Sequence, residues 1–332
     1  MHTTSNGTLG AADTNGVHNL DDANGVTQAT VAQAEDLAQN LEGYNYAFLD
    51  ELSKKAVRRA LLKGVAIPGY QVPFGSRELP IARGWGTGGL QITLSLVGPG
   101  DVLKVIDQGA DEGVNAVNIR RLVERTSPGV ETTLDTGEAT LIQTRHRIPE
   151  QPLREDQIMI FQVPQPEPLR NVEWREAETR RMHAEADYSR IWVALYEDVV
   201  QNGRVTRYAG YPVMVNDRHV MAPSPIPKWD VPKLHMAPYL SLFGAGREKR
   251  IYAVPPLTSV VPLSFEDYPF AVESFDGRVC ARCGSPNTYL VSLPDERGGS
   301  VYICSDSSWC DAALERVESG ELRVASDEES RS

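Results

Sequence analysis

The four cysteines of this chain lie in one short segment and arrive in two pairs. The first pair is Cys280-x2-Cys283 and the second is Cys304-x5-Cys310. Two short apolar runs, 289–291 and 301–303, lie between the pairs and are separated by the polar run 294–300, which predicts a hairpin with a cysteine pair at each open end. The four thiols are therefore expected to meet at one point, where they can bind a soft metal ion or an iron–sulfur cluster.

The spacing of the cysteines leaves the nature of that centre open. A Cys-x2-Cys pair followed some twenty residues later by two more cysteines is the outline of a structural zinc ribbon. The second pair is looser than a zinc ribbon usually has, and neither pair belongs to the Cys-x3-Cys-x2-Cys run common in radical enzymes that use S-adenosylmethionine. Zinc, a cluster and free thiols all remain possible from the residues alone.

Charge and hydropathy narrow the class of protein. The chain of 332 residues has a formal net charge of -12, which argues against nucleic acid as its main partner. We find no secretory signal at the N-terminus and no apolar run of the roughly 20 residues that span a bilayer. We therefore expect a cytoplasmic protein, without a membrane partner, whose thiols stay reduced, so disulfides are the least expected use of the cysteines.

The domain organisation follows from composition and periodicity. Residues 1–42 are polar and lack aromatics, which predicts a disordered tail. Residues 43–270 are expected to form a mixed α/β core of the α+β class, with a helical excursion near 172–203. Residues 271–317 form the four-cysteine module, and 318–332 read as an acidic tail.

Individual elements of the core are predicted from local patterns. We expect helices at 50–63, 101–108, 114–125, 174–202 and 311–317, strands at 90–97, 139–144 and 158–163, and a hairpin at 205–221 that turns at 216–217. The glycine-rich run 84–89 precedes what reads as a strand, so it is not interpreted as a phosphate-binding loop, which would open a helix.

Two local features have both an ordinary and a functional interpretation. Arg145, His146 and Arg147 come at the end of a predicted strand, and arginine forks suit phosphate or phosphonate oxygens. A surface loop salt-bridged with Glu150 and Glu155 explains these residues equally well. Gly69 follows a proline, and Pro-Gly is the usual pair at the centre of a type II turn.

Several blocks of the sequence together resemble the PhnJ subunit of bacterial carbon–phosphorus lyase. The resemblance runs from about residue 43 to Cys310, and the blocks that carry it are 66–75, 84–89, 101–111, 140–150, 243–256 and both cysteine pairs. It implies an enzyme of phosphonate catabolism that cleaves α-D-ribose 1-methylphosphonate 5-phosphate to methane and α-D-ribose 1,2-cyclic phosphate 5-phosphate.

The resemblance also implies a cofactor and roles for particular residues. Cys280, Cys283 and Cys304 would hold a [4Fe–4S] cluster with one iron open to S-adenosylmethionine, with zinc possible in resting or aerobic protein. Cys310 would supply the thiol that works on substrate and is also a candidate metal ligand at rest, while Gly69 would carry a glycyl radical. Arg145, His146, Arg147 and Gln162 are then the candidate substrate-binding residues.

The family resemblance finally implies partners. The lyase subunits PhnG, PhnH and PhnI and the ABC-type ATPase PhnK would assemble with this chain, and the charged helix that begins near Trp174 is a plausible docking element. The alternative, from a different functional class, is a non-catalytic zinc-ribbon subunit that scaffolds a multi-protein complex.

Overall fold

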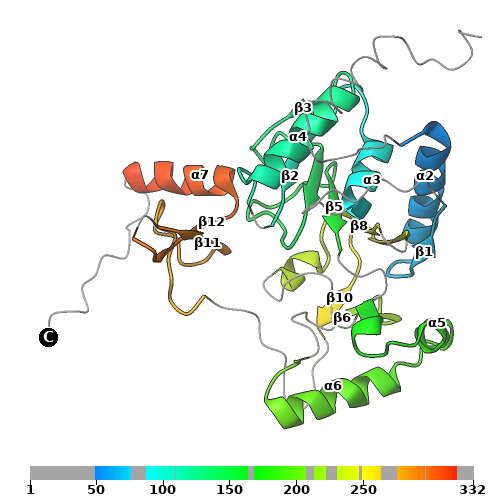
Figure 1. The fold of residues 1–332 in the computed structure, drawn as a ribbon. Helices are drawn as coiled ribbons and strands as arrows, with labels where there is room; N and C mark the ends of the chain where they lie inside the picture. Colours follow the sequence, from blue (N-terminus) through cyan, green and yellow to red (C-terminus); the bar gives the residue numbers. More distant parts are fainter. Residues whose placement is uncertain are drawn as a thin grey trace, which may run out of the picture. The chain divides into compact units, whose positions relative to one another are not determined.

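A computed structural model describes most of the chain from residue 49 onward (Figure 1). The described ranges are 49–75, 87–108, 110–163, 168–206, 213–221, 230–246, 249–262, 275–295 and 297–319. Contacts divide the chain into two units, Met1–Glu42 and Gly43–Ser332, and every described residue belongs to the second. The predicted N-terminal tail and most of the acidic tail lie outside the described residues.

A seven-stranded sheet forms the centre of the second unit. Its order is β1-β9-β8-β5-β4-β2-β3. The strands are β1 (Val72–Pro73), β2 (Val102–Ile106), β3 (Glu131–Thr132), β4 (Leu141–Thr144), β5 (Ile158–Gln162), β8 (Leu240–Ala245) and β9 (Arg250–Val254). The strands β4 and β5 confirm the two strands predicted there, and their near-continuous burial is typical of parallel strands covered on both faces.

The five strands from β3 to β8 run parallel to one another, and their order reverses once. β2 pairs with both β3 and β4, while β5 and β8 follow on the far side of β4. The chain therefore leaves β2 for one neighbour and returns to its other side at β4. In open α/β sheets, ligands bind beyond the carboxyl ends of the strands at such a reversal, so the ends of β2 and β4 are the places to look for a site.

Helices α2 (Glu51–Ala66) and α4 (Val114–Thr126) confirm two predicted helices. Asp50 caps α2 by accepting a hydrogen bond of 2.9 Å from the backbone N–H of Ser53, so the helix begins where the sequence has its capping residue. α2 packs on β9, and α4 packs on β2. The mixed α/β class expected from the sequence is confirmed.

The predicted strand at 90–97 is wrong, because this segment belongs to helix α3 (Thr87–Leu96). Its apolar residues alternate along the sequence, which favoured a strand, but residues 88–95 of the helix are all buried. A helix that is buried all round has no polar face and so gives no helical period. The backbone of β8 also approaches closely: a Cβ on Gly88 would lie 2.3 Å from the carbonyl oxygen of Gly244. The glycine-rich run therefore does lead into a helix.

The predicted helix at 101–108 is also wrong, because Val102–Ile106 is the parallel strand β2. Lys104 interrupts the apolar run of this strand, but its side chain is fully buried in the structure. Its ion-pair partners are Asp111 and Asp306, and the second of these lies 202 residues further along the chain. A local pattern cannot show that a lysine will find so distant a partner.

Two helices lie in the segment of the predicted excursion near 172–203, and a second, antiparallel sheet lies outside it. The sheet order is β10-β6-β7, with β6 (Val213–Val215) and β7 (His219–Met221) joined by a turn in which Asn216 and Asp217 both have positive φ, which confirms the predicted turn position. The strand β10 spans Val260–Pro262. The single helix predicted at 174–202 is two helices, α5 (Glu176–Glu185) and α6 (Ser189–Asn202), because Ala186 adopts a left-handed conformation that ends α5.

The four-cysteine module contains the predicted hairpin. Strands β11 (Leu290–Pro294) and β12 (Ser300–Cys304) pair in register, and α7 (Ser307–Glu318) follows. The helix begins four residues earlier than predicted, so Cys310 lies in it rather than before it. Short 3-10 turns, η2 (Pro168–Asn171) and η3 (Val231–Leu234), complete the list. None of the helices described is long and apolar enough to cross a bilayer.

Candidate metal centre and sheet-edge site

The four cysteines converge, as their spacing predicted. Cys280 and Cys283 lie in the turn before β11, Cys304 ends β12, and Cys310 lies in the first turns of α7. All four are buried and none forms a disulfide. Their sulfur atoms lie within 4.8 Å of one another, with Cys280 Sγ 3.7 Å from Cys310 Sγ and Cys283 Sγ 3.6 Å from Cys304 Sγ.

Backbone hydrogen bonds hold this arrangement and favour a thiolate at Cys280. The N–H groups of Arg282 and Cys304 point at its sulfur over 3.4 Å and 3.3 Å. Together with the neighbouring Cys304 thiol, which has the largest effect, they lower the pKa of Cys280 to about 4. Burial, followed by the charge of Cys280, raises the pKa of Cys310 to about 12. Because the sulfurs lie so close together, a second thiol ionises only when a bound cation offsets the charge of the first thiolate.

The donor set fits a soft metal. Four thiolates around one tetrahedral zinc ion, at Zn–S distances of about 2.3 Å, would stand about 3.8 Å apart, which is close to the two separations observed. Cysteine thiolates also hold iron–sulfur clusters. A four-iron cluster binds each sulfur through a different iron, however, so it requires the sulfurs to lie further apart than they do here. The four cysteines can hold a metal ion, and their spacing is that of a single ion.

Arg145 and His146 lie at the reversal of strand order, where the parallel sheet predicts a ligand. They follow the carboxyl end of β4, and an Arg145 Nη atom lies 2.6 Å from a carboxylate oxygen of Asp107, which directly follows β2. His146 is exposed and has a φ of 78°, which is unusual for a residue other than glycine and is often found at functional sites. Partial burial of its ring, followed by the charge of Arg145, lowers the pKa of His146.

Arg147 and Gln162 have protein partners instead of facing solvent. The Arg147 side chain is fully buried, pairs with Glu150 at 2.9 Å, and places its guanidinium 4.6 Å from the ring centre of Tyr289 in the cysteine module. Gln162, at the carboxyl end of β5, accepts a hydrogen bond from the backbone N–H of Gly89. The four predicted substrate residues thus share one edge of the sheet, but Arg147 and Gln162 are buried, and of the four only Arg145 and His146 are not.

Gly69 is the third residue of a tight turn, as its Pro-Gly context predicted. The N–H of Tyr70 donates to the carbonyl of Ile67 at 3.0 Å, and Gly69 has a φ of 78°. A Cβ at this position would lie 3.2 Å from side-chain atoms of Val215 and His219. These neighbours belong to β6 and β7, and the structure gives Gly69 no contact with a cysteine among the residues it describes.

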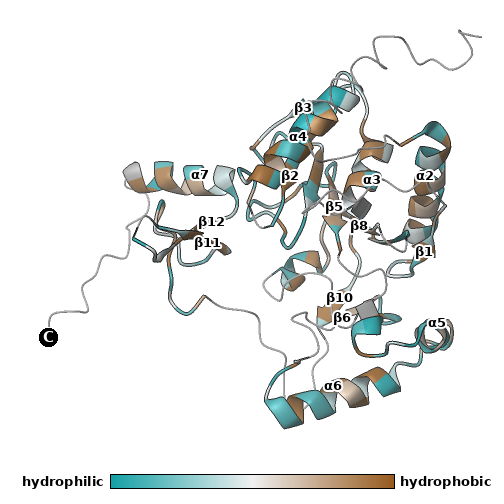
Figure 2. Ribbon diagram, viewed as in Figure 1, coloured by the Kyte–Doolittle hydropathy of each residue, from teal (hydrophilic) through white to brown (hydrophobic). Residues whose placement is uncertain are grey.

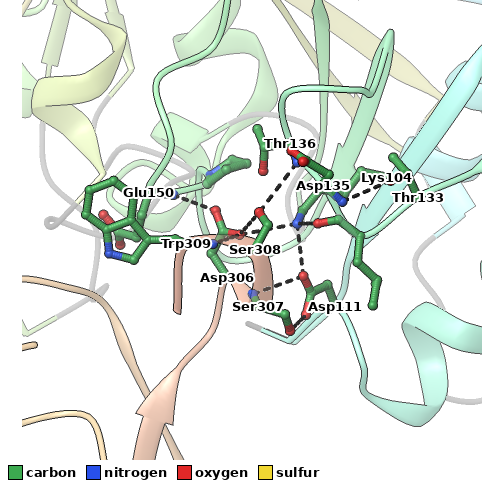
Figure 3. Close-up of polar contacts among 12 residues, drawn as sticks. Lys104, Asp111, Thr133, Asp135, Thr136, Glu150, Asp306, Ser307, Ser308 and Trp309 are labelled. Atoms are coloured by element: carbon green, nitrogen blue, oxygen red, sulfur yellow. Dashed lines mark hydrogen bonds and ion pairs between the residues drawn. The ribbon is translucent and has the colours of Figure 1, made fainter. Parts of the chain in front are cut away.

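Sequence reasoning missed a buried ion network that joins the cysteine module to the sheet (Figure 3). Lys104 on β2 contacts Asp111 and Asp306, and Asp306 lies between Cys304 and Cys310. Two signals were present: a lysine inside the apolar run 102–106, and an aspartate flanked by serines just before a helix, which is typical of a capping residue. Neither signal indicates that the two side chains meet.

Comparison with known proteins gives a consistent result. Residues 42–316 match the family model described as phosphonate metabolism protein PhnJ. The chain is 59% identical over 272 residues to alpha-D-ribose 1-methylphosphonate 5-phosphate C-P lyase of Escherichia coli (strain K12), which covers 82% of this chain and 96% of that protein. It is 54% identical over 293 residues to the protein of the same description from Rhizobium meliloti (strain 1021), covering 88% and 98%. The chain therefore belongs to the PhnJ family of phosphonate metabolism proteins.

Proposed function

We propose that this chain is the subunit of a carbon–phosphorus lyase that breaks the C–P bond of α-D-ribose 1-methylphosphonate 5-phosphate, releasing methane and leaving a ribose 1,2-cyclic phosphate 5-phosphate. Two observations support the proposal: relatives of 54% and 59% identity have that activity in their names, and four buried free thiols converge on one point. The identity to these relatives is the observation that carries it. A C–P bond offers no good leaving group for hydrolysis, so its cleavage calls for radical chemistry from a cofactor, and the four thiols are the groups that would hold one.

The cofactor in this proposal is a [4Fe–4S] cluster together with S-adenosylmethionine. Cys280, Cys283 and Cys304 would hold the cluster, which would supply the one-electron reduction that starts radical chemistry. Because the described sulfurs are spaced for a single ion, cluster assembly requires Cys280, Cys283 and Cys304 to move apart and Cys310 to leave the centre. Cys310 is the last of the four in sequence, and it sits on a different element from the other three.

A free Cys310 thiol is the group we propose to act on substrate. A glycyl radical at Gly69 would take the hydrogen atom of this thiol, and the thiyl sulfur would then bond to phosphorus while the methyl group leaves as a radical. The methyl radical would take a hydrogen atom from Gly69 to become methane, which restores the glycyl radical. The ribose 2-hydroxyl would then displace the cysteine sulfur and close the cyclic phosphate. Gly69 is proposed to exchange hydrogen with this thiol. Since its described contacts are with β6, β7 and β9, this role requires a rearrangement or a carrier between the two residues.

Arg145 and His146 are the residues we propose to bind the anionic groups of the substrate. Both stand at the strand ends where open parallel sheets bind ligands, and a guanidinium can bind two phosphate oxygens at once. The ion pair with Asp107 orients Arg145 before substrate arrives. Arg147 and Gln162 would contribute indirectly, since their polar groups contact neighbouring parts of the protein that shape the same edge.

We also propose that the chain works within a cytoplasmic complex that contains PhnG, PhnH, PhnI and the ATPase PhnK. Helix α6 supports a docking role for the excursion. Its inner face buries Ile191, Leu195 and Val199, yet its outer face exposes Val193, Tyr196 and Val200, so hydrophobic residues occur on both sides among hydrophilic ones (Figure 2). Apolar side chains spaced three and four residues apart on an exposed helix face are typical of a partner surface.

A zinc-ribbon scaffold is the competing function, and the single-ion spacing of the sulfurs favours it. Metal analysis separates the two. We expect anaerobically reconstituted protein to hold iron and sulfide, to show the broad visible absorption of a cluster, and to cleave S-adenosylmethionine. Replacing Cys280, Cys283 or Cys304 by alanine should abolish all three properties. Protein that takes up only tetrahedral zinc and never cleaves S-adenosylmethionine would contradict the radical proposal and support the scaffold.

A further inference from the structure

Three charged side chains are buried together where the cysteine module meets the central sheet (Figure 3). The Lys104 ammonium lies 2.9 Å from a carboxylate oxygen of Asp111 and 3.2 Å from one of Asp306, and it also donates to the carbonyl of Leu134. The three side chains are at most 2% exposed. Burying three charges costs several kcal/mol per ion before their attraction is counted, so an apolar contact would have joined the two parts at lower cost.

Asp306 uses both carboxylate oxygens, and each oxygen ties down a different part of the protein. Oδ1 receives the Lys104 ammonium and, in the first turn of α7, the Ser308 hydroxyl at 2.9 Å and the Trp309 N–H at 3.4 Å. Oδ2 receives the backbone N–H of Glu150 at 3.0 Å. One carboxylate therefore caps the helix that carries Cys310 and fixes that helix to the sheet.

The position of Asp306 in the chain links this contact to the metal centre. It lies two residues after Cys304 and four before Cys310, and its backbone carbonyl accepts the Cys310 N–H at 3.0 Å. Ser307 adds a second tie, since its N–H donates to Asp111 at 3.2 Å. The positions of Cys304 and Cys310 therefore depend on this short segment, and the contact with Lys104 fixes the segment to β2.

The same contact reaches the loop that carries the proposed substrate residues. Glu150, whose N–H is bound by Asp306, accepts the N–H of Tyr289 at 3.0 Å and pairs with Arg147. The loop from Arg145 to Glu150 thus connects the two candidate sites: its first residues lie at the sheet edge and its last residue contacts the cysteine module.

We propose that Asp306, held by Lys104, is a positioning residue that brings Cys304 and Cys310 into place for metal binding and fixes the metal centre relative to the loop from Arg145 to Glu150. The inference rests on the cysteine-held metal centre of the proposed function, but not on the identity of the metal or on radical chemistry. It assigns the network a role in metal affinity, beyond any contribution to folding.

Asp306→Asn is the direct test, because asparagine has the same shape and still offers one acceptor to Lys104 and the helix. Its NH2 group would face the N–H of Glu150, so one of the two ties is lost. We expect the full-length variant to bind Zn²⁺, in competition with a chromophoric chelator, about 10- to 100-fold more weakly than the wild type. With Co²⁺, the thiolate-to-metal absorption should also weaken as one sulfur leaves the centre.

Asp311→Asn is the matched control, since Asp311 also adjoins Cys310 but pairs with Arg282 at the surface. An exposed ion pair contributes little free energy, so the Zn²⁺ affinity of Asp311→Asn should stay within about twofold of the wild type. Circular dichroism and thermal unfolding of the metal-free proteins show whether both variants are folded. If Asp306→Asn does not fold, Ser307→Ala replaces it. That variant keeps the backbone N–H but loses the hydrogen bond that the Ser307 hydroxyl donates to the Asp111 carboxylate, and it should bind Zn²⁺ about two- to tenfold more weakly.

The outcomes separate this inference from the proposed function. Wild-type affinity and an unchanged Co²⁺ spectrum in folded Asp306→Asn, or in its Ser307→Ala replacement, would overturn the positioning role alone. An equal loss in Asp311→Asn would also overturn it, since a general charge effect would then explain both. A wild-type protein that binds neither Zn²⁺ nor Co²⁺ would overturn the metal centre itself, and the inference with it.

Discussion

Neighbouring residues of the run from Arg145 to Arg147 have opposite environments. The Arg145 side chain is 16% exposed and borders the strand ends, whereas Arg147 is fully buried against Glu150 and the ring of Tyr289. The sequence could show that the run is cationic, but not which guanidinium turns inward, because that depends on Tyr289, more than a hundred residues away. We therefore expect substrate to meet Arg145 first.

Arg145→Lys tests that expectation. Lysine keeps the positive charge beside Asp107, so stability should change little, but it lacks the planar fork that binds two phosphate oxygens. We expect the affinity for the phosphorylated substrate to fall by about 1.5–3 kcal/mol, measured by calorimetry on the assembled protein. Arg154→Lys is the control, since Arg154 pairs with Asp156 on the surface. Unchanged affinity in Arg145→Lys would return this arginine to a structural role.

At the scale of elements, the two segments assigned to the wrong class show no face to solvent, although the equally buried strands β4 and β5 were predicted correctly. Helix α2 alternates buried and exposed faces and begins at a capping aspartate, so its pattern and its start were both readable. Helix α3 and strand β2 are buried on all sides, and both were assigned to the wrong class. The cysteine hairpin was predictable because its short strands and polar loop are local features. The ion network that anchors it was not, because its partners are distant in sequence.

Strand β7 gives a prediction about pH. Its His219 is 2% exposed, packs beside His183 and Arg218, and contacts the Tyr188 hydroxyl at 3.4 Å. Burial, followed by the charges of His183 and Arg218, lowers the pKa of His219 from 6.5 to about 4. Below pH 6.5 the unfolded chain takes up a proton at this residue that the folded chain does not. The free energy of unfolding should therefore fall as the pH drops from 6.5 towards 4, by up to about 3 kcal/mol.

Comparison with His219→Gln isolates this contribution. Glutamine can still contact the Tyr188 hydroxyl but does not titrate, so urea unfolding of the variant should show a shallower loss of stability between pH 6.5 and 4. His235→Gln is a matched control, since His235 is exposed and its replacement removes no buried imidazole. If His219→Gln and the wild type lose stability in parallel over this range, His219 does not carry the effect.

At the scale of the whole molecule, the cysteine module and the sheet edge contact each other, whereas the structure describes no contact between the proposed radical carriers Gly69 and Cys310. The cysteine module and the edge of the parallel sheet share the contacts of Asp306, Glu150 and Arg147. Gly69 instead packs against β6, β7 and β9. We therefore expect substrate to bind between Arg145 and the cysteines, and we expect a movement or a carrier before Gly69 takes part.

Methane release is the measurement that tests the central claim most directly. The protein is produced with glycine deuterated at the α-carbon and is assembled with its partner subunits. It is then incubated with S-adenosylmethionine, a reductant and α-D-ribose 1-methylphosphonate 5-phosphate, and the released gas is analysed by mass spectrometry. We predict that the wild type releases methane, that part of it carries deuterium from Gly69, and that Cys310→Ser releases none although it still cleaves S-adenosylmethionine. Methane from the Cys310→Ser protein at the wild-type rate would contradict the claim that this thiol breaks the C–P bond.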